Sequence, residues 1–198
     1  MLRILGYWLM FKFQLGTREE RYEAVCDLAV VWEGYGRRAI RPLAVALRDP
    51  DPEIRRKAVR GLEEQFHEVF RSTGSIHVKE SERTWAVHNV YKRAGAIKAL
   101  RVALRDKTWE VRKDAAVVLG KVRGREAVAE LIESLEQDPE WVVRYESAEA
   151  LGRTGDPRAV EVLLAAALQD EHKDVRAQAK HGLALIDSDE AWQAYSRC

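Results

Sequence analysis

Six arginines recur along the chain at spacings that suit one kind of chemistry. They are separated by 34, 28, 29, 32 and 32 residues, and an aspartate stands six residues before four of them. A guanidinium and a carboxylate make charge-assisted hydrogen bonds, so each arginine can pair with its own aspartate or with that of the next unit, forming a ladder. We also expect each aspartate to accept hydrogen bonds from free backbone amides at a turn. These residues are therefore assigned to architecture and not to catalysis. The arginines are Arg21, Arg55, Arg83, Arg112, Arg144 and Arg176, and the aspartates are Asp49, Asp106, Asp138 and Asp170.

Two tryptophans, Trp109 and Trp141, each precede a repeat arginine by three residues, so we expect them to be neighbours on adjacent turns. The other units hold no aromatic residue at this position, so the repeat itself does not require one. Paired indoles flanked by lysines could hold a protein partner or stack on a base or planar ligand. The alternative is that both rings pack over the helices below.

The residues between these landmarks predict pairs of helices. In the clearest unit, residues 127–135 carry an apolar stripe at helical spacing, and Asp138-Pro139 then breaks the chain. A second helix follows over residues 143–151, with a small residue in its middle that lets neighbouring helices approach closely. We expect this helix to end at Gly152, in the left-handed conformation that glycine tolerates. The period predicts an all-α fold: a right-handed α-solenoid of stacked antiparallel helix pairs, about six units long.

Two junctions, Leu119–Val128 and Leu151–Val160, resemble the junction between HEAT repeats of the phycobilisome-lyase-like class. The resemblance is good over residues 39–62 and 96–185 and loose over residues 1–38. It implies an α-solenoid that mediates contacts between proteins. A minority of relatives act on tetrapyrrole chromophores, although no residue of this chain independently signals that chemistry.

One solenoid domain is expected over residues 1–198, with a divergent N-terminal unit at 1–38 and regular repeats at 96–185. The segment 63–95 departs from the pattern. Its apolar residues indicate that a helix continues to about Phe70, before a loop that begins near Ser72. Arg83, Ala86 and Val90 then preserve a second helix.

The composition is that of an ordered, soluble protein, with 46% hydrophobic and 33% charged residues. Two cysteines, Cys26 and Cys198, suggest no disulfide framework, which favours the cytoplasm. Residues 2–15 are apolar but too short to span a bilayer, so we expect them to form a first helix. No metal-ligand spacing, phosphate-binding loop or nucleophile elbow is present in the sequence, so we expect no cofactor and favour a protein that is not an enzyme.

The net charge of +1 conceals an asymmetry. Residues 1–125 hold 26 basic against 16 acidic residues, whereas residues 126–198 hold 7 against 16. Helix geometry places many of these charges on the outward face of the second helices, where the surface grades from basic to acidic at Tyr145, Glu146 and Glu149. Each such charge is otherwise an ordinary solvated side chain. The candidate partner-binding residues are Trp109, Trp141, Arg56, Lys57, Arg60, Lys92, Lys107, Lys113, Lys121 and Tyr145.

The sequence thus favours a non-enzymatic scaffold that binds an acidic or bipolar protein along the surface of the second helices. One alternative is nucleic-acid binding, including DNA repair, which would use the same basic residues. Another is a chromophore lyase or maturation factor, which rests on the family resemblance alone. Self-association is compatible with all three.

Overall fold

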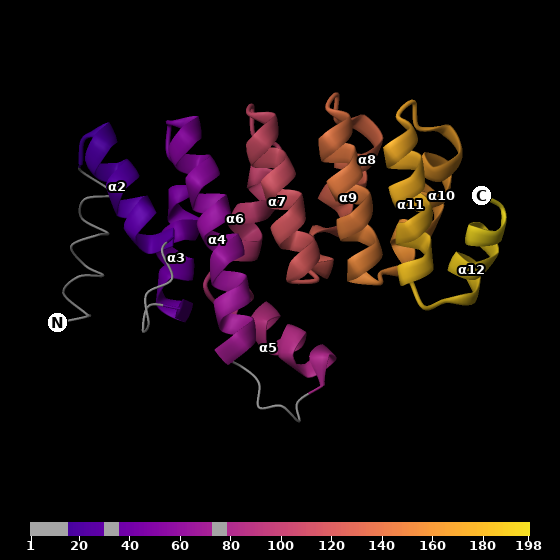
Figure 1. The fold of residues 1–198 in the computed structure, drawn as a ribbon, viewed down its shortest axis with the longest axis horizontal. Helices are drawn as coiled ribbons and strands as arrows, with labels where there is room; N and C mark the ends of the chain where they lie inside the picture. Colours follow the sequence, from indigo (N-terminus) through magenta and orange to yellow (C-terminus); the bar gives the residue numbers. More distant parts are fainter. Residues whose placement is uncertain (1–15, 30–35, 73–78) are drawn as a thin grey trace. The chain divides into compact units, whose positions relative to one another are not determined.

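The computed structural model describes residues 16–29, 36–72 and 79–198. Within these ranges the secondary structure consists of eleven α-helices and two short 3-10 helices, without a strand (Figure 1). None of these helices is long and apolar enough to cross a membrane. The helix expected over residues 2–15 lies outside the described residues.

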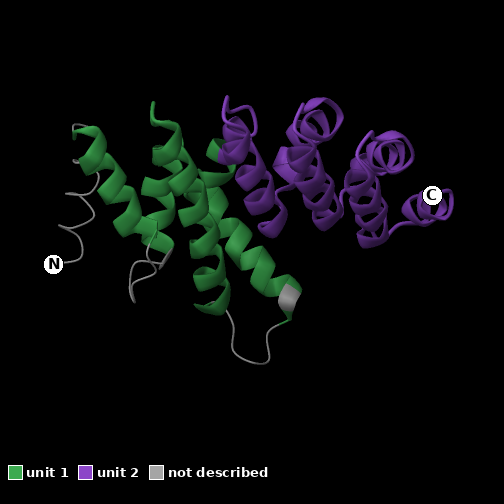
Figure 2. Ribbon diagram, turned by 45° about the horizontal axis from the view of Figure 1, so that its top comes forward, with its two compact units in different colours: residues 1–99 green, residues 100–198 purple. Residues whose placement is uncertain are grey.

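Contacts divide the chain into two compact units, residues 1–99 and 100–198 (Figure 2). In the first unit, the long helix α4 packs against each of its neighbours, α2, α3 and α5. Helix α6 begins in the first unit and ends in the second. The bounds are α2 (Arg18–Ala29), α3 (Gly36–Ala46), α4 (Pro52–Ser72), α5 (Glu80–Arg93) and α6 (Ala96–Ala103).

The second unit contains successive helix pairs. Helix α8 packs against α9 and α10 against α11, while the second helices α7, α9 and α11 lie side by side (Figure 1). This arrangement, with the helix pairs of the first unit, confirms the predicted all-α solenoid architecture of stacked pairs. The bounds are α7 (Trp109–Lys121), α8 (Val128–Gln137), α9 (Trp141–Thr154), α10 (Val160–Gln169), α11 (Lys173–Leu185) and α12 (Asp189–Ser196).

Small residues bring the second helices close together. A Cβ atom built on Gly152 of α9 would lie only 2.6 Å from the Cα of Gly182 in α11, closer than any side chain tolerates. The prediction that α9 ends at Gly152 is therefore wrong. The helix continues to Thr154, and Gly155, at φ 62°, takes the left-handed conformation that closes it. Gly152 serves helix packing instead of helix termination.

The irregular segment is partly as expected. Helix α4 runs without a break to Ser72, as predicted, and residues 73–78 of the expected loop lie outside the described residues. In α5, however, the buried face is formed by Val87 and Tyr91, whereas Ala86 and Val90 are half-buried. The repeat spacing that begins at Arg83 is therefore out of register with the core here.

Arg83 also differs from the other repeat arginines in its partners. Its guanidinium donates to the backbone carbonyl of Phe70 at 2.8 Å and lies over the Phe70 ring, 4.0 Å from the centroid. This arginine therefore stabilises the C-terminal end of α4.

Candidate partner-binding groove

The ladder of arginines and aspartates fixes the turns that begin the second helices. Arg144 donates from Nε and Nη2 to the two carboxylate oxygens of Asp170, at 2.9 and 3.1 Å. Its Nη1 donates to the Asp138 carbonyl at 2.9 Å. Asp170 in turn accepts a hydrogen bond from the His172 amide at 2.8 Å. The ladder and the turn-capping role of the aspartates are thus as predicted.

Two further rungs have the same geometry. Arg112 binds Asp138 at 2.6 and 2.8 Å, and Arg21 binds Asp49 at 2.8 and 3.3 Å. Each arginine reaches the aspartate of the following unit, so every rung joins two helix pairs. The ladder therefore holds successive second helices in a fixed spatial relation.

Burial and pairing act in opposite directions on the Asp170 carboxyl. Burial alone would raise its pKa, but the hydrogen bonds from Arg144 and from the His172 amide outweigh it and leave the pKa below the ordinary value of 3.8. The charged form of Asp170 is thus stabilised in the folded protein, which fits a structural role.

Trp141 stacks on the imidazole of His172 instead of on Trp109. The ring centroids of Trp141 and His172 are 3.9 Å apart and their planes differ by 10°. His172 belongs to the turn before α11, so the stack joins the two successive repeats that contain α9 and α11. Trp141 nevertheless keeps 39% of its surface exposed, and Trp109 keeps 37%. Both indoles therefore remain available to a partner, but as separate features.

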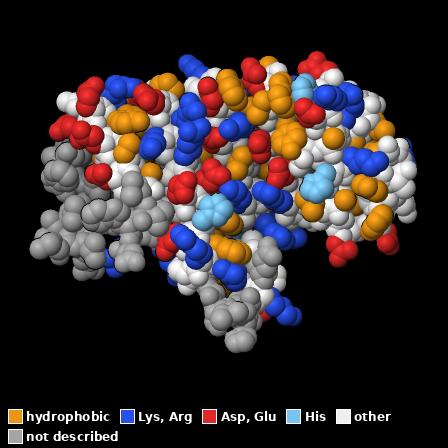
Figure 3. Space-filling model, in the orientation of Figure 1, with side chains coloured by type: hydrophobic (Ala, Val, Ile, Leu, Met, Phe, Trp, Pro, Cys, Tyr) orange, Lys and Arg blue, Asp and Glu red, His pale blue; other side chains and the backbone are white. Residues whose placement is uncertain are grey.

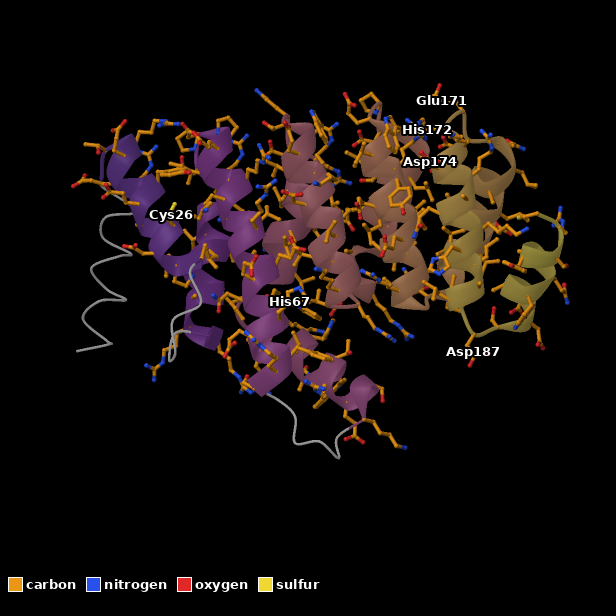
Figure 4. All side chains as sticks on the ribbon, viewed as in Figure 1. Cys26, His67, Glu171, His172, Asp174 and Asp187 are labelled. Atoms are coloured by element: carbon orange, nitrogen blue, oxygen red, sulfur yellow. The ribbon has the colours of Figure 1, made fainter. Side chains whose placement is uncertain are left out.

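A groove of about 530 Å³ lies between α9 and α11, beside this stack. Its walls combine aromatic, small apolar and acidic side chains, and none of its lining residues is basic. Figure 3 shows hydrophobic and acidic side chains next to each other over this part of the face, and Figure 4 shows His172 and Asp174 at the same end of α11. The lining residues are Trp141, Val142, Tyr145, Glu146, Asp174, Ala177 and Gln178.

Burial and neighbouring carboxylates raise the pKa values of two ionisable groups in the groove. Burial raises the pKa of Glu146, and the neighbouring carboxylate of Glu149 raises it further. The pKa of Tyr145 is likewise raised by burial and by the charges of Glu149, Glu146 and Asp174. In both groups burial is the largest cause and the neighbouring carboxylates add to it, so each side chain takes on negative charge less readily than it would in water.

The predicted basic residues differ in their exposure and pairing. Lys113 pairs with its neighbour Asp114, with Nζ 2.8 Å from the carboxylate. Arg56, Lys57 and Lys121 are half-buried. Their role in binding, and that of the exposed residues, stays a prediction. The exposed residues of the set are Arg60, Lys92 and Lys107.

Of the predicted residues, the structure brings together Trp141 and Tyr145, both of which line the groove. Sequence reasoning placed Glu146 on the outward face of α9 but did not include it among the binding residues. Asp174, two residues before Arg176, was missed, because the outward positions considered in the sequence all follow the repeat arginine. No cluster of His, Cys, Asp and Glu side chains in the described part of the chain could hold a metal ion.

Comparisons with known proteins agree on the fold. A family model for HEAT repeats matches residues 97–184. An engineered protein of known structure superposes with a TM-score of 0.66 at 22% identity, covering 98% of this chain and 84% of its own. A designed armadillo repeat protein in complex with the peptide (KR)4 superposes with a TM-score of 0.67 at 19% identity, covering 98% and 87%. No curated protein matches in sequence. The chain is therefore similar to HEAT and armadillo repeat proteins, while the phycobilisome-lyase-like class stays a prediction.

Proposed function

We propose that this protein is a non-enzymatic scaffold that binds a basic segment of a protein partner in the groove between α9 and α11. The observation that carries the proposal is the groove's lining, which has two aromatic side chains and two carboxylates but no basic side chain. Exposed aromatic residues in a concave surface are typical anchors of protein interfaces.

The groove can accommodate both the aliphatic stem and the charged end of a lysine or arginine side chain. The aliphatic stem of such a side chain can lie against Tyr145 and the exposed part of Trp141, since both border the groove. Its charged end can then pair with Glu146 and Asp174. A cation near the indole face gains a further electrostatic attraction. The stack with His172 holds Trp141 in place before binding, which lowers the entropic cost of association.

The designed armadillo repeat protein described above is bound to a basic peptide, (KR)4. That ligand belongs to the designed protein, and its fold is the part shared with this chain. The acidic groove independently supports a partner of the same charge. Repeat solenoids in general use their extended surfaces for binding proteins.

The sequence predicted an acidic or bipolar protein partner, and of these two we keep the bipolar one. Its basic segment would occupy the groove, and an acidic segment would meet exposed lysines such as Lys107. Nucleic acid is a poorer occupant of the groove, because its phosphates would face Glu146 and Asp174. The cytoplasm stays the predicted compartment.

A peptide-binding measurement tests the proposal. Fluorescence anisotropy of labelled (KR)4 should show weak but saturable binding, and a (DE)4 peptide should bind far less well. The double variant E146Q/D174N should lose about five- to thirtyfold in affinity, the effect of removing two charged contacts. W141A should weaken binding as well, since it removes the aromatic wall.

A matched control separates the groove from net charge. Glu161 on α10 and Asp187 after α11 are both exposed and lie outside the groove, and Asp187 is at the opposite end of α11 from Asp174 (Figure 4). The variant E161Q/D187N removes two negative charges, as E146Q/D174N does. Equal losses in the two variants, or equal binding of (DE)4 and (KR)4, would contradict the proposal.

A further inference from the structure

In the described part of the chain, Arg176 is a repeat arginine whose Nε and Nη2 donors have no carboxylate partner. Arg176 donates from Nη1 to the backbone carbonyls of Asp170 and Glu171, at 2.7 and 3.1 Å. Arg144 makes the same contacts with the carbonyls of Asp138 and Pro139, at 2.9 and 3.4 Å. The two arginines are thus anchored alike at the start of their helices.

They differ at the other edge of the guanidinium. In Arg144, Nε and Nη2 donate to the two carboxylate oxygens of Asp170. Arg112 donates in the same way to Asp138. We call such a pair a closed rung. In Arg176, this pair of donors has no carboxylate partner among the described residues. Asp189 and Glu190, at the start of α12, do not supply one.

The two backbone contacts of Nη1 hold the Arg176 guanidinium in place, so its Nε and Nη2 donors form a preorganised binding site. Two backbone carbonyls already hold one side of the Arg176 guanidinium, so less side-chain entropy remains to be lost when a ligand binds. The remaining donors form the planar fork that matches a carboxylate with two parallel hydrogen bonds. The closed rungs show this use of the same fork elsewhere in the chain.

We propose that Arg176 binds the carboxylate of an aspartate side chain from a protein partner that packs beside the start of α11. In the closed rungs, the carboxylate comes from an aspartate that also accepts a backbone amide at a turn, as Asp138 does from Glu140 at 3.0 Å. An aspartate in a turn before a helix of the partner has this geometry. Glu171 and Asp174 lie close by in sequence and would repel the second charge of a phosphate.

This site is separate from the proposed groove. Arg176 is not among the groove's lining residues, and its expected ligand has the opposite charge to the groove's ligand. The two proposals can therefore fail independently. A partner that uses both would have to be bipolar.

The test follows the Nε–Hε signals of the arginines by NMR during titration with sodium acetate at constant ionic strength. The Arg176 signal, assigned from its absence in R176K, should shift saturably, while those of Arg144 and Arg112 should not move. A dissociation constant of roughly 10–100 mM is expected for so small a ligand. R176K should retain the wild-type circular dichroism spectrum, because no carboxylate depends on Arg176.

Three results would overturn the assignment. They are a shift of Arg176 that is linear or absent, equal shifts at Arg144, and inorganic phosphate saturating Arg176 at lower concentration than acetate. The last would assign the site to a phosphate-bearing ligand. A parallel titration with sodium chloride removes the effect of the added salt.

Discussion

Arg144 and Arg176 form a matched pair for measuring what one rung of the ladder contributes to stability. Both donate from Nη1 to two backbone carbonyls, but only Arg144 also binds a carboxylate, that of Asp170. Replacing each with alanine therefore removes the shared backbone contacts in both variants and the rung in one. The difference between R144A and R176A therefore measures the carboxylate contacts of Arg144, with Asp170 and with Glu171.

The structure sets the expected size of this difference. Only 8% of the Arg144 side chain and 7% of the Asp170 side chain are exposed, so R144A leaves a buried carboxylate without its partner. Such a loss costs about 3–5 kcal/mol. The extra contact with Glu171 adds little, because that side chain is 82% exposed. The shared backbone hydrogen bonds cost about 1–2 kcal/mol in either variant.

Urea unfolding at neutral pH, followed by far-ultraviolet circular dichroism, gives both free energies of unfolding. R144A should be less stable than R176A by about 3–5 kcal/mol, a large part of the roughly 5–15 kcal/mol typical of folded domains. Repetition at lower pH adds a second readout. The pKa of Asp170 is lowered in the folded protein, so its stabilising effect is present above 3.8 and is lost as the pH falls through the lowered value.

In R144A, burial of Asp170 persists without the arginine, so the pKa of this carboxyl should rise instead. The gap between wild type and R144A should therefore narrow as the pH falls from above 3.8, through the raised pKa of Asp170 in the variant, to the lowered pKa in the wild type. We expect a broken buried ion pair to cost about 3–5 kcal/mol. If the free energies of unfolding of R144A and R176A differed by less than about 1 kcal/mol, the rungs would not stabilise the fold as proposed. A gap that does not change with pH would exclude Asp170 as the cause.

Two further predictions concern the packing and the groove. G152A should destabilise the protein by roughly 1–3 kcal/mol in urea unfolding, because the new Cβ would lie 2.6 Å from the backbone of Gly182; a neutral substitution would mean that α9 and α11 are not held this closely. Affinity for (KR)4 should fall as the pH is lowered from neutrality toward the ordinary glutamate value of 4.5, because the raised pKa of Glu146 brings its protonation into that range. E146Q should show a flatter profile, and an identical profile would mean that Glu146 does not contact the peptide.

The ladder could be predicted from the sequence because its two parts are periodic. An aspartate six residues before an arginine recurs in four units, and the period alone places one unit's arginine near the next unit's aspartate. Arg83 is an exception, although the unit that follows it holds Asp106. There the chain continues α4, and the guanidinium binds the carbonyl of Phe70 instead.

The end of α9 could not be predicted, because Gly152 and Gly155 both lie where a helix might close. Spacing does not distinguish a glycine that permits close packing from one that takes a positive φ. The choice depends on the approach of α11 at Gly182, and on Thr154, whose hydroxyl donates to the Leu151 carbonyl at 2.7 Å inside the last turn.

The groove was predicted only in part. Helical spacing placed Tyr145 and Glu146 on the outward face of α9. The space beside them depends on the sizes of Val142 and Ala177, and the orientation of Trp141 depends on its stack with His172. These contacts join two successive repeats, so the residue pattern within a single repeat could not predict them.

Exchange of the groove's charge tests the central claim most directly. E146K/D174K would replace the two carboxylates of the groove with ammonium groups, and anisotropy titrations with (KR)4 and (DE)4 would be compared with those of the wild type and of E161K/D187K. We expect E146K/D174K to prefer (DE)4, whereas E161K/D187K, with the same net charge, should still prefer (KR)4. If both variants changed preference equally, or neither did, peptide selection would not reside in the groove between α9 and α11.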